Sequence, residues 1–396
     1  MPRSIPFVRL TLLPLLVTTL AACGGTPTVP DQPVAAIAPT VVPATAVPSP
    51  TASPTAAPSP TTAPTTVPTP TTEPTAIPTP TAEPTTISTP TPQPDVSVVT
   101  GEGSFARGNI RQRPWMVMID NHPDAYPQSG LNKAAVVFEG LAEYGVTRFI
   151  GVFQDGVTED VGEIGPVRST RLYFAQWAMG FHPVYAYAGG SPDGVKLAET
   201  TDQFIKFDAL RQPKYTWRDR KRVAPHNLYT SSSLLRAFAE DKQVAVFNDA
   251  SVGYLFDNST PASPPTVNGL DYFFLDQRSR AGFSYDQATN GYYRSMRGHP
   301  HIDRVTGQRL WTRNVVVMQV TEAARPGDEK RRIDQAVVGS GPARVFNGGR
   351  SVDVTWRKTD AASPLRFYDA DDNEIVFAEG PIWIAAIPAL SRLTQR

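Results

Sequence analysis

The chain has 396 residues, 40 of them proline and one of them cysteine, and its 37 basic and 37 acidic side chains give a formal net charge of zero. This balance lacks the positive charge that nucleic-acid-binding proteins use, so no nucleic acid is expected as a partner. The single cysteine excludes an internal disulfide and a zinc site made of several cysteines.

The first 23 residues have the pattern of a bacterial lipoprotein signal. Arg3 and Arg9 precede an apolar run, residues 10–20, and two alanines then lead to Cys23. The run is shorter than the roughly 20 apolar residues that a membrane-spanning helix needs. We predict that residues 1–22 are removed, that Cys23 is lipidated, and that the lipid anchors the protein on the extracytoplasmic face of a bacterial cell membrane. The alternative is an ordinary secretory signal with a cysteine there by chance.

Residues 23–107 are predicted to be a disordered tether. From 26 to 94 the chain is almost entirely Pro, Thr, Ala, Ser and Val, and it contains no aromatic residue that could build a core. Proline-rich chains favour extended polyproline II at about 3.1 Å per residue, so this stretch would reach on the order of 200 Å. It would lift the rest of the chain away from the membrane; the alternative is a tail that only adds solubility.

Residues 108–256 are predicted to form an α/β domain, in which helices cover a sheet, because apolar strand patterns alternate with helical ones. Strands are expected at 115–119, 134–138, 146–153, 184–188 and 244–247. Helices are expected at 170–179, 194–200 and 231–241.

Residues 266–396 are predicted to form a second domain with a mainly antiparallel sheet or small barrel. A linker rich in turn residues, 257–265, precedes it. Asn290-Gly291 is a strong hairpin signal. Further strands are expected at 315–320, 343–346, 351–356 and 382–387.

Arginines gather near the predicted start of the helix at 170–179. The free N–H groups of a helix start and the planar guanidinium forks both suit a phosphate or carboxylate ligand. Ser169 or Thr170 is expected to cap that helix. The candidate ligand-binding residues here are Arg148, Arg168, Ser169 and Arg171. The alternative is that the arginines form ion pairs inside the fold, with Asp120, Glu139 or Glu143.

Asp120, Asn121 and His226 are further candidate ligand-binding residues. The first two follow a predicted strand, and ligands commonly bind at strand ends in α/β sheets. His226, in a loop, could be a general base or a ligand. For all three the alternative is an ordinary turn or a hydrogen-bonded structural role. Two nearby carboxylates, Glu139 and Glu143, could serve acid–base chemistry, but pairing with Arg148 is favoured.

His299, His301 and Asp303 form a possible second cluster, because alternate residues of a strand share one face. Pro300 disturbs such a strand, and no fourth ligand is evident. We therefore predict no metal here, and a hydrogen-bonded cluster near the domain junction instead. No cofactor is expected from any other motif. The Gly189-Gly190-Ser191 turn is followed by a proline, which removes the amide that usually helps form an oxyanion hole.

Many short motifs, in order, resemble the YerB-like lipoproteins, a bacterial family without an established reaction. The resemblance rests on the segments 118–123, 127–131, 138–139, 147–149, 164–171, 189–191, 225–229, 285–286, 293–294, 299–303, 314–317, 339–341, 356–358 and 383–384. It implies an extracytoplasmic lipoprotein with two associated domains. A weaker resemblance is to the LytR-CpsA-Psr wall-polymer transferases, but the acidic residue expected after the arginine of Pro166-Val167-Arg168 is absent.

The leading hypothesis is a membrane-anchored lipoprotein that binds an anionic cell-envelope ligand through the arginines of its first domain. One alternative is an envelope enzyme that acts on phosphate-linked glycans or lipids, using Asp120 or Glu139 with a metal. Another is a structural or interaction lipoprotein whose polar motifs only hold its domains together. Nothing in the sequence identifies a protein partner.

Overall fold

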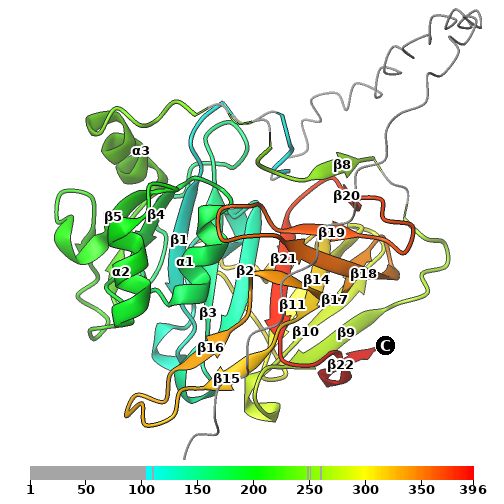
Figure 1. Cartoon of the computed structure of the whole chain (residues 1–396). Coiled ribbons are helices and arrows are strands. Elements are labelled where there is room, and N and C mark those ends of the chain that lie inside the picture. Colours follow the sequence, from blue (N-terminus) through cyan, green and yellow to red (C-terminus); the bar gives the residue numbers. More distant parts are fainter. Residues whose placement is uncertain (1–103, 109–110, 248, 250, 259–260) are drawn as a thin grey trace, which may run out of the picture. The chain divides into compact units, whose positions relative to one another are not determined.

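A ten-stranded mixed sheet runs through the protein, in the order β19-β18-β17-β14-β21-β2-β3-β1-β4-β5 (Figure 1). The computed structural model describes residues 104–108, 111–247, 249, 251–258 and 261–396. The predicted signal, Cys23 and nearly all of the predicted tether lie outside these residues. The strands of this sheet are β1 (Trp115–Asp120), β2 (Val136–Leu141), β3 (Thr147–Phe153), β4 (Val184–Tyr187), β5 (Ile205–Asp208), β14 (Asn314–Gln319), β17 (Gly339–Asn347), β18 (Arg350–Lys358), β19 (Arg366–Tyr368) and β21 (Ile382–Ile387).

Strand direction brings several carboxyl ends to one edge of this sheet. β3 is antiparallel to both β1 and β2, which therefore run in the same direction. β4 and β5 continue in parallel from β1, and β21 and β14 continue in parallel from β2. β17, β18 and β19 complete the sheet as antiparallel neighbours.

Each face of the sheet carries its own hydrophobic core, because alternate residues of a strand point to opposite faces. Met116 and Met118 of β1 pack with α1 (Leu172–Met179) and α2 (Pro192–Thr200). Val117, the residue between them, packs in the other core, which includes α3 (Ser232–Asp241) and apolar residues of a second sheet.

The second sheet has the order β12-β11-β10-β9-β22, with β13 paired to β11. Its strands are antiparallel, and Asn290 at the β10–β11 turn has a positive φ of 47°, as the hairpin signal predicts. They are β9 (Gly269–Phe273), β10 (Arg280–Asp286), β11 (Gly291–Met296), β12 (His299–Pro300), β13 (Trp311–Thr312) and β22 (Leu393–Gln395).

Short elements complete the described structure. Three two-stranded pairs are β6 (Trp217–Arg218) with β7 (Leu228–Tyr229), β8 (Leu255–Asp257) with β20 (Val376–Ala378), and β15 (Glu322–Ala324) with β16 (Ile333–Gln335). The 3-10 helices are η1 (Pro123–Ala125), η2 (Leu131–Lys133), η3 (Glu143–Gly145), η4 (Ala209–Arg211), η5 (Gln277–Ser279) and η6 (Leu390–Arg392).

The predicted fold class is confirmed: a mixed sheet with helices in the first part, and mainly antiparallel strands in the second. β14 and β21 depart from the antiparallel pattern, because they join the first part's sheet in parallel next to β2. The two segments predicted as domains therefore share one sheet, and neither segment completes it alone. The domain boundaries themselves stay a prediction.

Two local expectations were wrong. Residues 244–247 form no strand; Val246 makes one isolated bridge to Gln112 and is 78% exposed. The helix expected from residue 170 begins at Leu172, and its N-cap is Arg171, without a side-chain capping bond. The Thr170 hydroxyl is instead 2.7 Å from the Tyr185 hydroxyl, inside the core.

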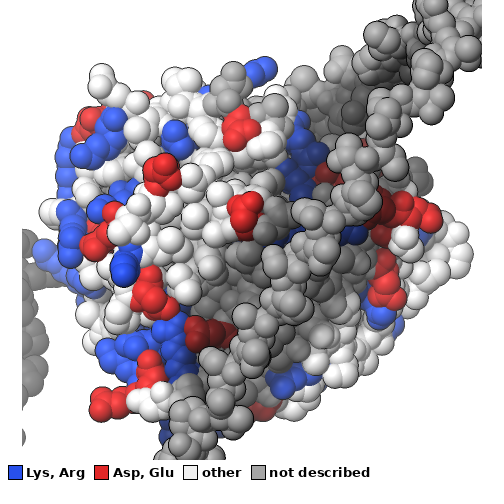
Figure 2. All heavy atoms as spheres, in the orientation of Figure 1, with Lys and Arg blue, Asp and Glu red and all other residues white. Residues whose placement is uncertain are grey.

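The surface carries both signs of charge. In Figure 2, basic and acidic side chains are intermixed over the visible face, as the zero net charge of the chain leads one to expect. Within the described residues, no helix is both long enough and apolar enough to cross a membrane.

Candidate functional site

The segment that follows Ile164 lies across the carboxyl ends of β1 and β4. Arg168 donates its backbone N–H to the Met118 carbonyl oxygen and accepts from the Ala188 N–H. The Asp120 N–H in turn donates to the Pro166 carbonyl oxygen. These bonds place Arg168 beside Asp120 at the sheet edge where ligands commonly bind in α/β folds.

Asp120 is the centre of a group that we call the Asp120 cluster, comprising Asp120, His122, Arg168 and His226. The Asp120 side chain is 2% exposed, and its Oδ2 lies 2.6 Å from His226 Nδ1 and 3.0 Å from Arg168 Nε. Its Oδ1 accepts the backbone N–H of His122. The rings of His122 and His226 stack, with centroids 4.5 Å apart. The structure therefore brings together three predicted site residues, Asp120, Arg168 and His226, which belong to three separate motifs in the sequence.

Arg168 keeps part of its guanidinium available. Its side chain is 23% exposed, and the Nε contact to Asp120 is an ion pair that lacks the alignment of a hydrogen bond. Among the described residues, no hydrogen bond from its two terminal nitrogens is found. Arg168 is thus the predicted arginine that remains open to a ligand.

Arg148 and Arg171 are instead occupied by Glu143. Arg148 Nη2 lies 3.1 Å from Glu143 Oε2. Arg171 donates hydrogen bonds to both oxygens of the same carboxylate, with Nη2 at 2.7 Å from Oε2. Arg148 also donates to the Ser169 carbonyl oxygen at 3.1 Å. All three ionic side chains are about one-tenth exposed or less. This is the ion pairing that the sequence left open as the alternative, with Glu143 as the partner.

The electrostatics of this triplet follow from burial. Burial, and then the charge of Arg171, lower the pKa of Arg148 to about 10. Burial alone would raise the pKa of Glu143, but the hydrogen bond from Arg171 and the charges of both arginines lower it overall. The carboxylate therefore stays ionised between the two guanidiniums.

Glu139 lies in a closed buried network, not beside Arg148 as expected. β2 continues to Leu141, so Glu139 points towards the second sheet. We call this group the Glu139 network: its oxygens accept bonds from the side chains of Thr147 (3.1 Å), Tyr272 (3.1 Å), Arg294 (2.8 Å) and Trp383 (3.0 Å). Glu139 and Arg294 are both fully buried, so neither can meet a ligand.

Asn121 and His301 extend this network. The Asn121 amide donates to Thr147 Oγ1 at 2.6 Å and accepts from Gln128 Nε2 at 3.0 Å. Gln128 Oε1 lies 2.8 Å from His301 Nε2, and Arg294 Nε donates to His301 Nδ1 at 3.2 Å. This pattern fits a neutral imidazole, and burial together with the charge of Arg294 lowers the pKa of His301 well below its usual value.

The possible second cluster does not assemble. His299 is exposed on β12, whereas His301 is buried. Asp303 accepts backbone N–H groups from Val305 and Thr306, which is a local turn. The three side chains thus face different surroundings, and the absence of a metal there stays a prediction.

Comparison with known proteins decides the family. Residues 99–245 match the N-terminal domain, and residues 270–384 the C-terminal domain, of a family described as a protein of unknown function, DUF3048. The chain belongs to the DUF3048 family. The predicted YerB-like resemblance is therefore confirmed, and membership assigns no reaction.

The YerB protein of Bacillus subtilis, as a curated sequence and as a crystal structure, shows how far the likeness extends. The curated protein "Putative lipoprotein YerB" of Bacillus subtilis (strain 168) is 32% identical over 286 residues, which cover 70% of this chain and 82% of that protein. A crystal structure of the YerB protein from Bacillus subtilis aligns with a TM-score of 0.63 and 27% identity, over 72% of this chain and 94% of that one.

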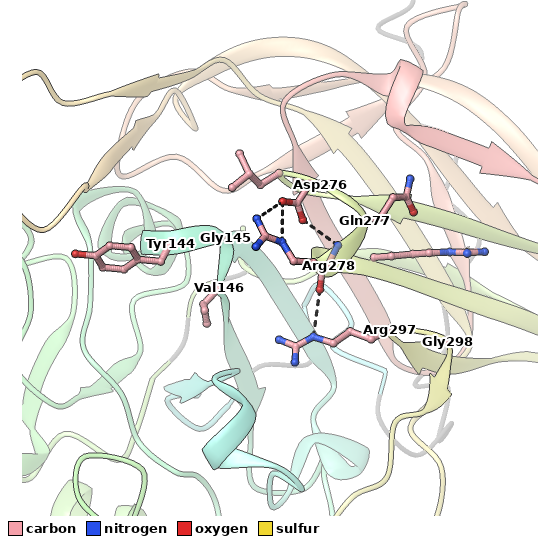
Figure 3. Close-up of a pocket in the computed structure, with 10 residues that line it drawn as sticks. Tyr144, Gly145, Val146, Asp276, Gln277, Arg278, Arg297 and Gly298 are labelled. Carbon is pink, nitrogen blue, oxygen red and sulfur yellow. Dashed lines mark hydrogen bonds and ion pairs between the residues drawn. The ribbon is translucent and has the colours of Figure 1, made fainter.

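A separate hollow of about 610 Å³ lies between η3, η5 and the turn that follows β11 (Figure 3). Tyr144 and Leu275 contribute exposed apolar surface to it. Arg278 is held by Asp276 at 2.6 Å, and Arg297 donates to the Arg278 carbonyl oxygen. None of its lining residues belongs to the Asp120 cluster, so this hollow and the clustered ionisable groups are different places in this DUF3048 chain.

Sequence reasoning overlooked Asp124, and it did not include His122 among the candidate ligand-binding residues. In the structure, ligand atoms of His122, Asp124 and His226 all lie within 4.8 Å of one another. The signal that could have found them is the His-Pro-Asp order directly after a strand end, but its third member, His226, lies about a hundred positions further along the chain.

Proposed function

We propose that this DUF3048 protein is a lipid-anchored extracytoplasmic lipoprotein that binds a phosphate-bearing cell-envelope ligand at the Asp120 cluster. The anchor is supported by the signal pattern that ends at Cys23 and by the name of the Bacillus relative. The binding site is supported by one observation above all: the partly exposed guanidinium of Arg168 stands beside two imidazoles at the carboxyl end of β1.

The ion pairs of Glu143 reduce the number of predicted residues that can contact a ligand. Arg148, Ser169 and Arg171 take part through the Glu143 pairs, which hold the segment that carries Arg168 in place. Asn121 also has a positioning role, because its side chain is bonded to Thr147 and Gln128. The groups that reach a ligand are then Arg168, His122 and His226. Guanidinium–phosphate bonds are charge-assisted and commonly bidentate, which gives both affinity and orientation.

The test is calorimetric titration of the full chain in detergent, at constant ionic strength, with inorganic phosphate or glycerol phosphate as the ligand. Each titration is made once with added Zn²⁺ and once with EDTA, because ligand atoms of His122, Asp124 and His226 lie close enough to hold a metal ion. Wild type should bind in at least one of these buffers. Arg168→Ala should lose about 1.5–3 kcal/mol of binding free energy, the usual value of a charge-assisted hydrogen bond.

Arg278→Ala is the matched control, because it removes the same charge from an exposed arginine that pairs with Asp276. It should bind phosphate as wild type does. Absence of binding in both buffers, or equal losses in the two variants, would remove the phosphate-binding proposal. A thermal melt of each variant separates loss of binding from loss of folding.

An enzymatic function is the second candidate. Asp120 accepts the Nδ1–H of His226, an arrangement that orients an imidazole for proton transfer from its other nitrogen. Glu139, the other carboxylate considered for catalysis, is excluded by its burial. Release of phosphate from a polyprenyl pyrophosphate by wild type, and its loss in His226→Gln, would favour an enzyme acting on phosphate-linked envelope lipids. If the protein neither binds such compounds nor turns them over, the structural or interaction role is the hypothesis that remains.

A further inference from the structure

Three side chains at the Asp120 cluster have the composition of a metal site. His122 is the N-cap of η1, Asp124 lies within η1, and His226 reaches the same place from the loop before β7. His122 Nδ1 lies 3.5 Å from Asp124 Oδ2. Two ligands that each bind one tetrahedral zinc at about 2.1 Å stand about 3.4 Å apart, so this pair has the spacing of two zinc ligands. His122 Nδ1 also accepts the Asp124 backbone N–H at 3.3 Å, and a metal ion at this nitrogen would replace that bond.

Asp120 prepares His226 for a metal. The buried carboxylate lies 2.6 Å from Nδ1 of His226, so that nitrogen carries the proton and donates it to Asp120. The lone pair of the neutral ring is then on Nε2. Metal-binding histidines commonly donate their other N–H to a carboxylate, which fixes the ring and makes the ligating nitrogen more basic.

The ligands have room to close around an ion. The side chains of His122 and Asp124 are 40% and 72% exposed, so they can rotate without disturbing the core. The His122–His226 stack must open slightly, because ligating lone pairs lie in the ring planes. Two imidazole nitrogens and one carboxylate oxygen suit zinc and similar divalent transition metals, and three protein ligands leave a fourth position open.

We propose that His122, Asp124 and His226 bind a divalent transition-metal ion of the zinc class, with Asp120 as the group that positions His226. The metal deepens the proposed function and rests on it in one respect: the open position would accept a phosphate oxygen beside Arg168.

Charge supports this link between metal and anion. The cluster and the adjacent ion pairs contain as many carboxylates as guanidiniums, so with neutral histidines their charges cancel. The carboxylates are Asp120, Asp124 and Glu143, and the guanidiniums are Arg148, Arg168 and Arg171. An anion gains little from a neutral site, whereas a bound dication would make the same site positive.

Metal binding is tested first, with the metal alone. The full chain is stripped with EDTA, dialysed against micromolar Zn²⁺ or Co²⁺, and assayed for bound metal and for the Co²⁺ visible spectrum. We expect one equivalent in wild type and at least a tenfold loss of affinity in His122→Gln, Asp124→Asn and His226→Gln. His299→Gln is the matched control, since His299 is exposed on β12 and should leave binding unchanged. His301→Gln should also leave it unchanged.

Two outcomes would overturn the metal site: wild type that holds less than a tenth of an equivalent, or His122→Gln that binds as wild type does. His122 is 40% exposed and its side chain caps η1 by accepting the Asp124 N–H, a bond that glutamine can also accept. His122→Gln should therefore stay folded without metal, and a thermal melt of the metal-free variant checks this.

The phosphate titration then separates this inference from the proposed function. Zinc binding without phosphate binding would support the metal site and remove the proposed ligand. Phosphate binding that is equally strong in EDTA would support the proposed ligand and remove the link to the metal. Phosphate binding that is at least tenfold stronger with zinc than with EDTA supports both.

Discussion

The buried Glu139–Arg294 pair offers the sharpest test of how the two parts of the chain are held together. Glu139 lies on β2 and Arg294 on β11, the two side chains are fully buried, and Arg294 Nη2 lies 2.8 Å from Glu139 Oε1. The guanidinium also lies over the Trp383 ring, 4.2 Å from its centroid. Burial by itself would lower the pKa of Arg294, but the charge of Glu139 raises it overall, so the guanidinium stays protonated.

Arg294→Met should destabilise the protein by about 3–5 kcal/mol, because it leaves the Glu139 carboxylate buried without its counter-charge. For a folded part of this size, about 2 °C of melting temperature corresponds to each kcal/mol, so the expected loss is roughly 6–10 °C at pH 7. Thermal unfolding followed by circular dichroism measures this shift.

The double variant Glu139→Gln/Arg294→Met tests the reasoning. It should be more stable than the sum of the two single changes predicts, since no unpaired charge remains. Arg278→Met, at an exposed ion pair, should hardly shift the melting temperature. An Arg294→Met shift no larger than that of Arg278→Met, or strict additivity in the double variant, would refute the account of a coupled buried pair.

Four further predictions concern Cys23, the Pro/Thr-rich stretch, His301 and Glu322. Cys23→Ser should abolish labelling by a fatty-acid analogue and release the protein from membranes or leave its signal uncleaved; equal labelling of both forms would contradict the anchor. A chain that starts at Gly101 should keep the melting temperature of the full mature chain, because a Pro/Thr-rich stretch without aromatic residues is expected to bury almost nothing. A drop of many degrees would show that the stretch packs on the rest. Because the pKa of His301 is lowered in the folded protein, the unfolded chain binds a proton below about pH 6.5 that the folded chain does not bind. The wild type should therefore lose stability on acidification in this range more steeply than His301→Gln does. Parallel stability curves of the two proteins would contradict this prediction. Burial raises the pKa of Glu322 to about 7 from 4.5, so its protonated form contributes up to about 3 kcal/mol that is lost as the pH rises from 4.5 through 7; Glu322→Gln should flatten this dependence, and an unchanged pH profile would disprove it.

Local pattern accounts for much of the fold. The hairpin at Asn290-Gly291 and the helix at 231–241, which Ser231 caps in the structure, were both expected from the sequence, because each depends on the conformational preference of a few neighbouring residues. The family could also be recognised from short motifs in order. The helix start at 170 was misplaced, since Thr170 finds a hydroxyl partner in the distant Tyr185.

The candidate site divides along the same line. The sequence by itself determined which chemically active residues lie at a strand end, near a helix start or in a loop, and these are Asp120, Arg168 and His226 respectively. The choice of partner was decided only by the tertiary structure. Glu139 and Glu143 are four positions apart and equally plausible as partners of Arg148, yet the continuation of β2 directs Glu139 to Arg294 and leaves Glu143 to the arginines. The Asp120–His226 contact and the Glu139–Arg294 pair each join segments more than a hundred positions apart. Their formation depends on strand order, direction and burial, which local residue preferences do not encode.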